Sequence, residues 1–284
     1  MKKILLFTLL VALCSPAFAW EDKQDSLEIA YEFSDYGYRE PHMEYPIHIS
    51  GKKHGVSFAY TRRHVFSSFN SVEEDPSFAR LEALYMNGKV DYDGYLQDGT
   101  PFENYDEKDW YVDVDLKLGR VYTLDETLSA WPYIGIGYRT LRNGEDGIKD
   151  FNGTPGYVYQ RTSTYVYVPI GASFVWTPTE ETRLTLSGEF DWLLHGNQNS
   201  HLPASADVSS VSNAQDKGFG VRASAKFEVG FGAFSVFAEP FYRYWKIQNS
   251  DVVAYFDYSA MQWYGAQEPF NITREYGVRV GVAF

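Results

Sequence analysis

Apolar and polar residues alternate with a period of two along almost the whole chain after residue 20, and helical spacing is hard to find. Such alternation is typical of β-strands with one face buried in an apolar environment. It restricts this chain of 284 residues to an all-β fold. Ten segments carry the pattern: Leu27 to Ser34, Gly55 to Phe66, Phe78 to Lys89, Trp110 to Tyr122, Trp131 to Leu141, Tyr159 to Trp176, Arg183 to His195, Phe219 to Val229, Ala233 to Trp245 and Tyr276 to Phe284.

The connections between these segments indicate what the apolar faces meet. Long polar stretches of about 17 to 30 residues follow the odd-numbered segments, and mostly short turns follow the even-numbered ones. Long loops on one rim and short turns on the other are typical of an outer-membrane barrel, whereas a soluble sandwich, the alternative, has no reason for that asymmetry. We therefore predict an all-β, ten-stranded antiparallel transmembrane β-barrel of up-and-down topology, with long extracellular loops and short periplasmic turns.

The N-terminus has the composition of a secretory signal peptide. Two lysines precede an apolar run from Ile4 to Leu13, which is too short to span a bilayer as an anchor. Small residues then precede a cleavage site between Ala19 and Trp20. We predict that residues 1–19 are removed and that residues 20–284 form one outer-membrane barrel domain.

The charged residues divide between the two faces of the predicted strands and the loops. The chain has a net charge of -13, which argues against a nucleic-acid partner. The face turned away from lipid carries equal numbers of acids and bases, which we expect to form a packed ion-pair network, because an unpaired buried charge is costly. The acids are Glu28, Glu32, Glu82, Asp113, Asp115, Glu189, Asp191, Glu228 and Glu239, and the bases are Arg80, Lys117, Arg139, Arg161, Arg183, Arg222, Lys226, Arg243 and Arg279. The excess of acid is then expected in loops, as between Asp98 and Asp109.

Ten strands enclose little more than their own side chains, so we expect a plugged interior rather than a wide porin. Pro169 and Pro240 fall inside predicted strands and should each cause a bulge or a local break in pairing. Gly135 and Gly137 should make room for tyrosine rings or arginine stems. Aromatic residues near the segment ends are expected in lipid-facing girdles: Trp110, Trp131, Trp176, Trp192, Tyr122, Tyr138, Tyr242 and Tyr244.

Four strings resemble a family of Gram-negative outer-membrane β-barrel proteins of uncharacterised function: Tyr38 to Pro41, Gly88 to Gly94, Pro132 to Arg139 and Gln215 to Glu228. The C-terminal Phe284, preceded by alternating apolar residues, is similar to the signal that the barrel-assembly machinery reads. The resemblance implies the fold, a location in the cell outer membrane and contact with outer-membrane lipid and lipopolysaccharide. It does not fix a ligand, a substrate or a cofactor.

A weaker, topological similarity is to the omptins, ten-stranded outer-membrane proteases that carry an acid pair and an Asp-His pair at two strand ends. By that similarity Asp91 and Asp93 would hold a water molecule, His195 would accept its proton and Asp191 would orient His195, as general acid/base catalysis requires. The omptin pair is Asp-x-His, whereas three residues separate Asp191 from His195. Residues four apart on a strand lie about 13 Å apart, too far to hydrogen-bond without a bulge.

We therefore interpret the chain as a structural, adhesive or ligand-binding surface protein whose specificity lies in its extracellular loops. An omptin-like protease or another outer-membrane hydrolase is the alternative, and a narrow channel is the second alternative. No cofactor is expected. The four histidines of the first hairpin (His42, His48, His54 and His64) have no fixed ligand spacing, so no metal site is expected either.

Overall fold

A computed structural model describes residues 25–42, 44–65, 76–95, 99–144, 147–151, 154–201, 210–258 and 260–284. The predicted signal peptide and its cleavage site between Ala19 and Trp20 lie outside the described residues. In the part of the chain that the structure describes, no helix is long and apolar enough to cross a membrane.

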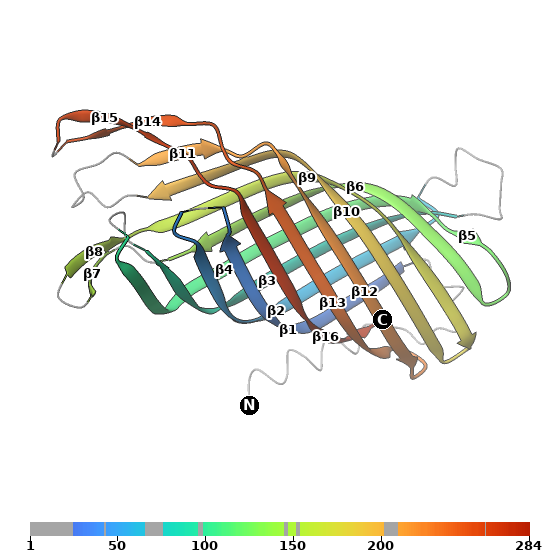
Figure 1. Cartoon of the computed structure of the whole chain (residues 1–284). Coiled ribbons are helices and arrows are strands. Elements are labelled where there is room, and N and C mark those ends of the chain that lie inside the picture. Colours follow the sequence, from blue (N-terminus) through green and yellow to red (C-terminus); the bar gives the residue numbers. More distant parts are fainter. Residues whose placement is uncertain are drawn as a thin grey trace, which may run out of the picture.

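Ten antiparallel strands form a closed barrel (Figure 1), which confirms the predicted fold class. They are β1 (Asp25–Glu40), β2 (Ile47–Arg63), β3 (Ser77–Tyr95), β4 (Pro101–Arg120), β6 (Leu128–Asn143), β9 (Gln160–Thr179), β10 (Thr182–His201), β12 (Gly218–Gly230), β13 (Ser235–Ile247) and β16 (Asn271–Ala283). Each strand pairs with the next one along the chain, and β16 pairs with β1 to close the cylinder, with Ala283 opposite Glu28. Closure leaves the barrel without an exposed edge.

Short strands lie beside the barrel or beyond it. They are β5 (Tyr122–Thr123), β7 (Gly147–Phe151), β8 (Thr154–Val158), β11 (Val211–Ala214), β14 (Val253–Asp257) and β15 (Gln262–Ala266). The pairs β7–β8 and β14–β15 each form a separate two-stranded sheet. In Figure 1 both project from the barrel end opposite the C-terminus.

The barrel strands extend further toward that end than the alternation predicted. β1 continues to Glu40 and β2 begins at Ile47, so a short connection replaces the long loop expected between them. Likewise, β4 begins at Pro101, well before the predicted Trp110. The prediction was wrong here because the outward face of these extensions is polar, so the contrast between apolar and polar positions fades although the strand continues.

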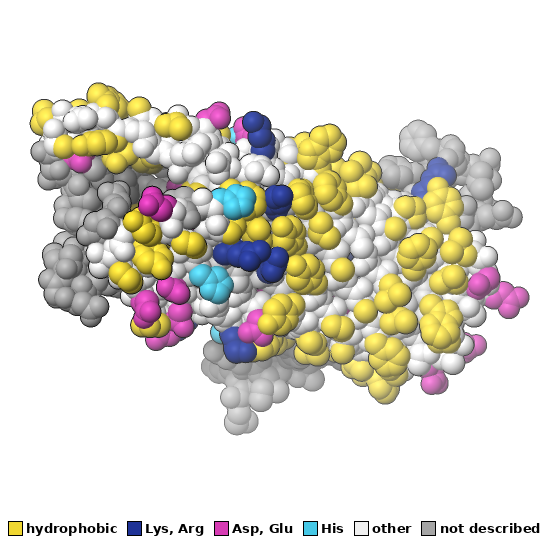
Figure 2. Space-filling view, viewed as in Figure 1, with side chains coloured by type: hydrophobic (Ala, Val, Ile, Leu, Met, Phe, Trp, Pro, Cys, Tyr) yellow, Lys and Arg dark blue, Asp and Glu magenta, His cyan; other side chains and the backbone are white. Residues whose placement is uncertain are grey.

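The outer wall is apolar over the middle of the barrel. Figure 2 shows hydrophobic side chains spread over this wall, with acidic side chains mainly toward its two ends. Outward residues such as Phe33, Val56, Ile136 and Val278 are exposed on four different strands. Large apolar side chains exposed all along a closed barrel are what a lipid-facing surface requires.

The two prolines inside the strands, Pro169 and Pro240, interrupt the pairing locally. Pairing is missing beside Pro169 on the β6–β9 side and beside Pro240 on the β12–β13 side, while the register continues unshifted past each proline. The expected local break is therefore present at both, without a bulge.

Trp131, expected in a lipid-facing girdle, lines the lumen instead. It shares the inward face of β6 with Tyr133 and packs against Phe78 with ring centroids 5.3 Å apart.

Candidate functional site

The lumen of the barrel contains a larger and a smaller cavity. The larger, of about 210 Å³, lies in the half near the chain termini, where Ser26 and Phe284 contribute to its lining. The smaller, of about 50 Å³, lies near the opposite rim, where Asn143 and Ile247 are the last residues of their strands. Charged side chains from many strands line the larger cavity and separate it from the smaller one.

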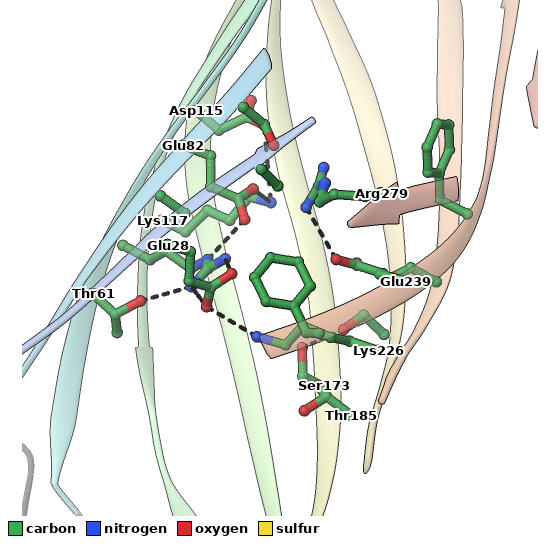
Figure 3. Close-up of a pocket in the computed structure, with 18 of the residues that line it drawn as sticks. Glu28, Thr61, Glu82, Asp115, Lys117, Ser173, Thr185, Lys226, Glu239 and Arg279 are labelled. Carbon is green, nitrogen blue, oxygen red and sulfur yellow. Dashed lines mark hydrogen bonds and ion pairs between the residues drawn. The ribbon is translucent and has the colours of Figure 1, made fainter. Parts of the chain in front are cut away.

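The larger cavity is crossed by a chain of ion pairs (Figure 3). The Glu28 carboxylate accepts hydrogen bonds from Arg80 and Lys226, both at 3.0 Å. Arg80 also donates to Glu82 (2.7 Å), and Lys117 lies between Glu82 (2.6 Å) and Glu189 (2.7 Å). These side chains come from five strands and point toward one another. Pairing and hydrogen bonding offset the cost of removing their charges from water.

Arg222 on β12 is the centre of a second cluster, which we call the Arg222 cluster. Its guanidinium lies within 3.3 Å of the carboxylates of Asp113, Asp115, Glu189 and Asp191. It also donates to the Tyr167 hydroxyl (2.5 Å), which in turn contacts Asp113 and Asp115. One guanidinium thus gathers carboxylates from β4 and β10, using the several donors that make arginine suited to such sites.

A third cluster, the Arg243 cluster, completes a polar layer across the lumen. Arg243 donates to Glu32 (2.7 Å) and to the Tyr111 hydroxyl (3.3 Å), and Tyr111 donates to Glu275 (2.6 Å). Arg279 connects this layer to the larger cavity by donating to Glu32 (2.7 Å) and Glu239 (3.2 Å). Since Arg243 lies directly opposite Arg222 across β12 and β13, the two clusters are adjacent.

The structure gives an ion-pair partner to every residue of the predicted interior network. Three contacts complete the set: Arg139 to Asp113 (3.8 Å), Arg161 to Glu40 (3.5 Å) and Arg183 to Glu228 (4.0 Å). The prediction that the interior holds equal numbers of acids and bases was wrong, however. Buried Glu40, Glu107, Asp109 and Glu275 are also on the inward face, whereas the further inward cations in the described strands are Lys53, which pairs with Asp109, and Arg63, which lines the larger cavity.

The additional acids lie in the parts of the strands that the sequence segments omitted. Asp109, expected with the loop acids, lies in β4, and Glu275 lies in β16 just before the predicted Tyr276. The inward positions continue at every second residue beyond the predicted ends, as at Tyr36 and Glu40. Following the period-two alternation through the polar residues at the strand ends would have predicted these inward positions.

The four residues of the protease alternative do not come together. Asp91 and Asp93 are exposed on the outer face of β3, and the Asp91 carboxylate accepts from the Asp106 backbone N–H (3.0 Å). Asp191 is fully buried inside the barrel, where it pairs with Arg222 (2.8 Å). His195 is exposed, and its Nδ1 lies 2.7 Å from Asp216.

A β-bulge explains the position of His195. The pairing of β10 with β9 shifts by one residue between Leu193 and His195. Two consecutive residues, Leu194 and His195, are therefore exposed, and the inward positions resume at Gly196. Because one extra residue reverses the faces, Asp191 and His195 lie on opposite sides of the wall rather than on one face. The geometry assembles no general acid/base pair from these four residues.

No group of three or more His, Cys, Asp or Glu side chains is arranged to hold a metal ion within the described residues. The histidines of the first hairpin are used separately. The ring of His42, for example, stacks on Phe270 at 4.5 Å between centroids, and that of His54 lies 6.3 Å from Tyr31.

The β14–β15 hairpin is the second candidate region. It exposes large apolar side chains beyond the barrel rim: Tyr258 is 58% exposed, Met261 74% and Trp263 65%. The hairpin pairs only with itself in the described sheets, and its rings also pack on one another, with Phe256 and Trp263 5.3 Å apart. Exposed apolar groups clustered away from the lipid-facing wall are typical of a binding surface.

Comparison with solved structures places this architecture among known barrels. The outer-membrane protease OmpT from Escherichia coli matches with a TM-score of 0.63 at 9% identity, over 95% of this chain and 99% of that one. The transport unit of the autotransporter AIDA-I from Escherichia coli matches with a TM-score of 0.40 at 9% identity, over 96% of each chain. The chain has the fold of a Gram-negative outer-membrane β-barrel.

No family model matches this chain, and no curated protein matches its sequence. At 9% identity the similarity to OmpT concerns the fold alone. A fold does not specify an activity, so the function must be argued from the residues of this chain.

Proposed function

We propose that this protein is a non-conducting surface protein of the outer membrane that binds an extracellular partner through the β14–β15 hairpin. The exposed aromatic side chains of that hairpin carry the proposal. The hairpin lies at the end of the barrel opposite the C-terminus (Figure 1), and in outer-membrane barrels the long connections face the exterior. Aromatic side chains bring large contact area to an interface at small conformational cost, which favours an adhesive or ligand-binding role.

The polar layer across the lumen supports the non-conducting part of the proposal. The Arg222 and Arg243 clusters fill the cross-section between the two cavities with hydrogen-bonded ion pairs. Opening a path through them would leave buried charges unpaired, which costs about 3 to 5 kcal/mol for each broken pair. We also propose that lipid and lipopolysaccharide surround the apolar wall and that the barrel-assembly machinery inserts the chain.

The proposed binding role of the β14–β15 hairpin can be tested by measuring the attachment of cells. Cells displaying the protein should attach to at least one member of a panel of immobilised glycans and extracellular-matrix proteins. A Trp263→Ser/Tyr264→Ser variant should lose that attachment, because it removes exposed aromatic area without touching the barrel. Tyr105→Ser is the matched control, since Tyr105 is 63% exposed on β4. Equal attachment by displaying and non-displaying cells to the whole panel would contradict the proposal.

Measurements of conductance test whether the lumen is closed. Refolded protein in planar bilayers should give no single-channel steps in symmetric salt. Regular steps from the wild-type protein would instead favour the narrow-channel alternative and would refute the closed lumen.

A further inference from the structure

Three basic side chains lie together on the outer wall, near the rim from which the β14–β15 hairpin projects. Ile272, close to the start of β16, is an outward residue of this wall, because Asn271 and Thr273 on either side of it line the smaller cavity. Two basic residues lie directly opposite Ile272, Arg39 on β1 and Lys246 on β13. Arg274, the next outward residue of β16, is a diagonal neighbour of both, within reach of a long side chain. We call Arg39, Lys246 and Arg274 the Arg274 patch.

The cations of the Arg274 patch form no ion pair with a carboxylate of the described residues. Both arginines are exposed, and the ammonium of the half-buried Lys246 lies 5.5 Å from the centre of the Phe270 ring. Asp35, an outward acid beside the patch on β1, pairs with Lys52 instead (3.2 Å). Like charges on neighbouring strands repel one another, so an anion bound between them would stabilise the patch.

The Arg274 patch lies at the edge of the apolar wall. Tyr276, the outward residue that follows Arg274 on β16, is 59% exposed and lies opposite Tyr242, and exposed Val278 and Val280 come next. Exposed tyrosines at the edge of a lipid-facing wall lie at the level of the lipid headgroups. Figure 2 shows Lys and Arg side chains gathered beside the apolar wall, on the side toward the hairpin end. Basic side chains cost little at this level but much at the middle of the bilayer.

The headgroups at the exterior level of an outer membrane carry phosphate. The outer leaflet consists of lipopolysaccharide, whose membrane anchor, lipid A, is a phosphorylated glucosamine disaccharide with several acyl chains. Arginine donates parallel N–H bonds to phosphate oxygens, and lysine adds a point charge. Clustered basic residues next to a membrane surface bind anionic headgroups in this way. The patch therefore has the charge and the position that a lipid A phosphate requires.

We propose that the Arg274 patch binds a phosphate group of lipopolysaccharide in the outer leaflet. The phosphate oxygens accept hydrogen bonds from Arg39 and Arg274 and lie beside the Lys246 ammonium, while the acyl chains extend along the apolar wall. The inference rests on the proposed function, which places this end of the barrel at the cell exterior. It assigns a lipid partner to residues outside the β14–β15 hairpin.

Lipid A with and without its phosphates tests the site. Titration of the refolded barrel in detergent, followed by native mass spectrometry, should show saturable binding of bisphosphorylated lipid A. Lipid A without phosphates has the same acyl chains and should bind at least tenfold more weakly. Inorganic phosphate at equal concentration should not displace the lipid. Equal binding of the two lipids would overturn the proposal, and displacement by inorganic phosphate would overturn the lipid as the partner.

A double variant tests the two arginines. Arg39→Gln/Arg274→Gln removes both guanidinium groups from exposed positions and should weaken the binding of bisphosphorylated lipid A at least tenfold. Arg62→Gln is the matched control, because the Arg62 side chain is 53% exposed at the opposite end of the wall, and it should bind like the wild type. The heat-dependent gel shift of a folded barrel reports whether each variant folds. If the folded double variant binds lipid A as tightly as Arg62→Gln, the assigned patch is wrong.

The Trp263→Ser/Tyr264→Ser hairpin variant separates this proposal from the proposed function. It should bind bisphosphorylated lipid A like the wild type even though it loses attachment. Absence of attachment by the wild type would refute the role of the hairpin but not the lipid site, because the lipid titration uses purified protein. Loss of lipid A binding in the hairpin variant would place the lipid on the hairpin and so refute the patch.

Discussion

At Gly137 the fold requires the absence of a side chain. A β-carbon built on Gly137 would overlap the ring of Tyr167 and the carboxylate of Asp115. Tyr167 needs this place because its hydroxyl contacts Arg222 and the two aspartates of β4. The expected role of Gly137, making room for a tyrosine ring, therefore has a specific purpose, which is to admit Tyr167 to the Arg222 cluster.

Gly137→Ala should destabilise the barrel by about 1 to 3 kcal/mol, since the added methyl group displaces Tyr167 from its bonds in a packed interior. Denaturant unfolding of the refolded protein in lipid vesicles measures the change. Gly188→Ala is the control, because a β-carbon there meets nothing within 4 Å. Equal stability of the two variants would contradict the packing described for Tyr167.

Arg222→Met should cost about 3 to 5 kcal/mol, because it leaves several buried carboxylates without their shared cation. The same unfolding measurement applies. Arg142→Met removes a charge from an exposed, outward position on β6 and should change the stability little. An Arg222→Met barrel as stable as the Arg142→Met barrel would show that the carboxylates find other partners or take up protons.

Single elements are shaped by local irregularities in otherwise regular strands. The bulge between Leu193 and His195 turns His195 outward, and a second register shift lies between Thr182 and Leu184 at the other end of β10. The turn before β6 is fixed by Asp125, whose Oδ1 accepts from the Thr127 N–H (2.7 Å), the Thr127 hydroxyl (3.0 Å) and the Leu128 N–H (2.9 Å). This is the arrangement that makes aspartate a frequent turn residue.

The stability contributed by Asp125 should depend on pH. The bond from the Thr127 N–H, together with that from the Thr127 hydroxyl, holds the pKa of the Asp125 carboxyl below its ordinary value. Because the pKa is lower in the folded chain, the contribution is complete above the unfolded pKa and is lost as the pH falls through the folded pKa. Asp125→Asn should therefore be less stable than the wild type at pH 7, and the difference should begin to shrink below about pH 4 and vanish below the folded pKa of Asp125.

Unfolding midpoints across that pH range measure the effect of Asp125→Asn. Glu126→Gln, at the exposed neighbouring position, is the control for the loss of one negative charge. A difference between Asp125→Asn and the wild type that stays constant from neutral to acid pH would exclude the carboxylate as its cause.

The whole molecule depends on joining the two ends of the chain. Leu27 and Phe284 exchange backbone hydrogen bonds of 3.1 and 2.9 Å where β1 meets β16. Strand closure also brings Glu32 of β1 within reach of Arg243 and Arg279, so the polar layer exists only in the completed barrel. The ends of the sequence are thus held together both on the wall and in the lumen.

The Phe284→Ser variant tests the predicted assembly signal, the side chain of Phe284, separately from the backbone pairing that closes the barrel. The substitution keeps both backbone bonds to Leu27 but removes the aromatic side chain. We expect a several-fold smaller folded fraction in the outer membrane of cells, while refolding of the purified variant proceeds as in the wild type. The heat-dependent gel shift measures both. Normal assembly of Phe284→Ser in cells would rule out the side chain as the signal.

The sequence by itself determined which face of each strand is apolar, because that pattern depends only on the period of an extended chain and on contact with lipid. It therefore predicted the ten strands and the inward charges from Glu28 to Arg279. The tertiary structure decided the rest. The position of His195 depends on a bulge set by pairing with β9, and Arg222 of β12 has two of its partners, Asp113 and Asp115, on β4, which is distant in sequence. Pairing and closure are non-local, so alternation along one strand could not reveal them.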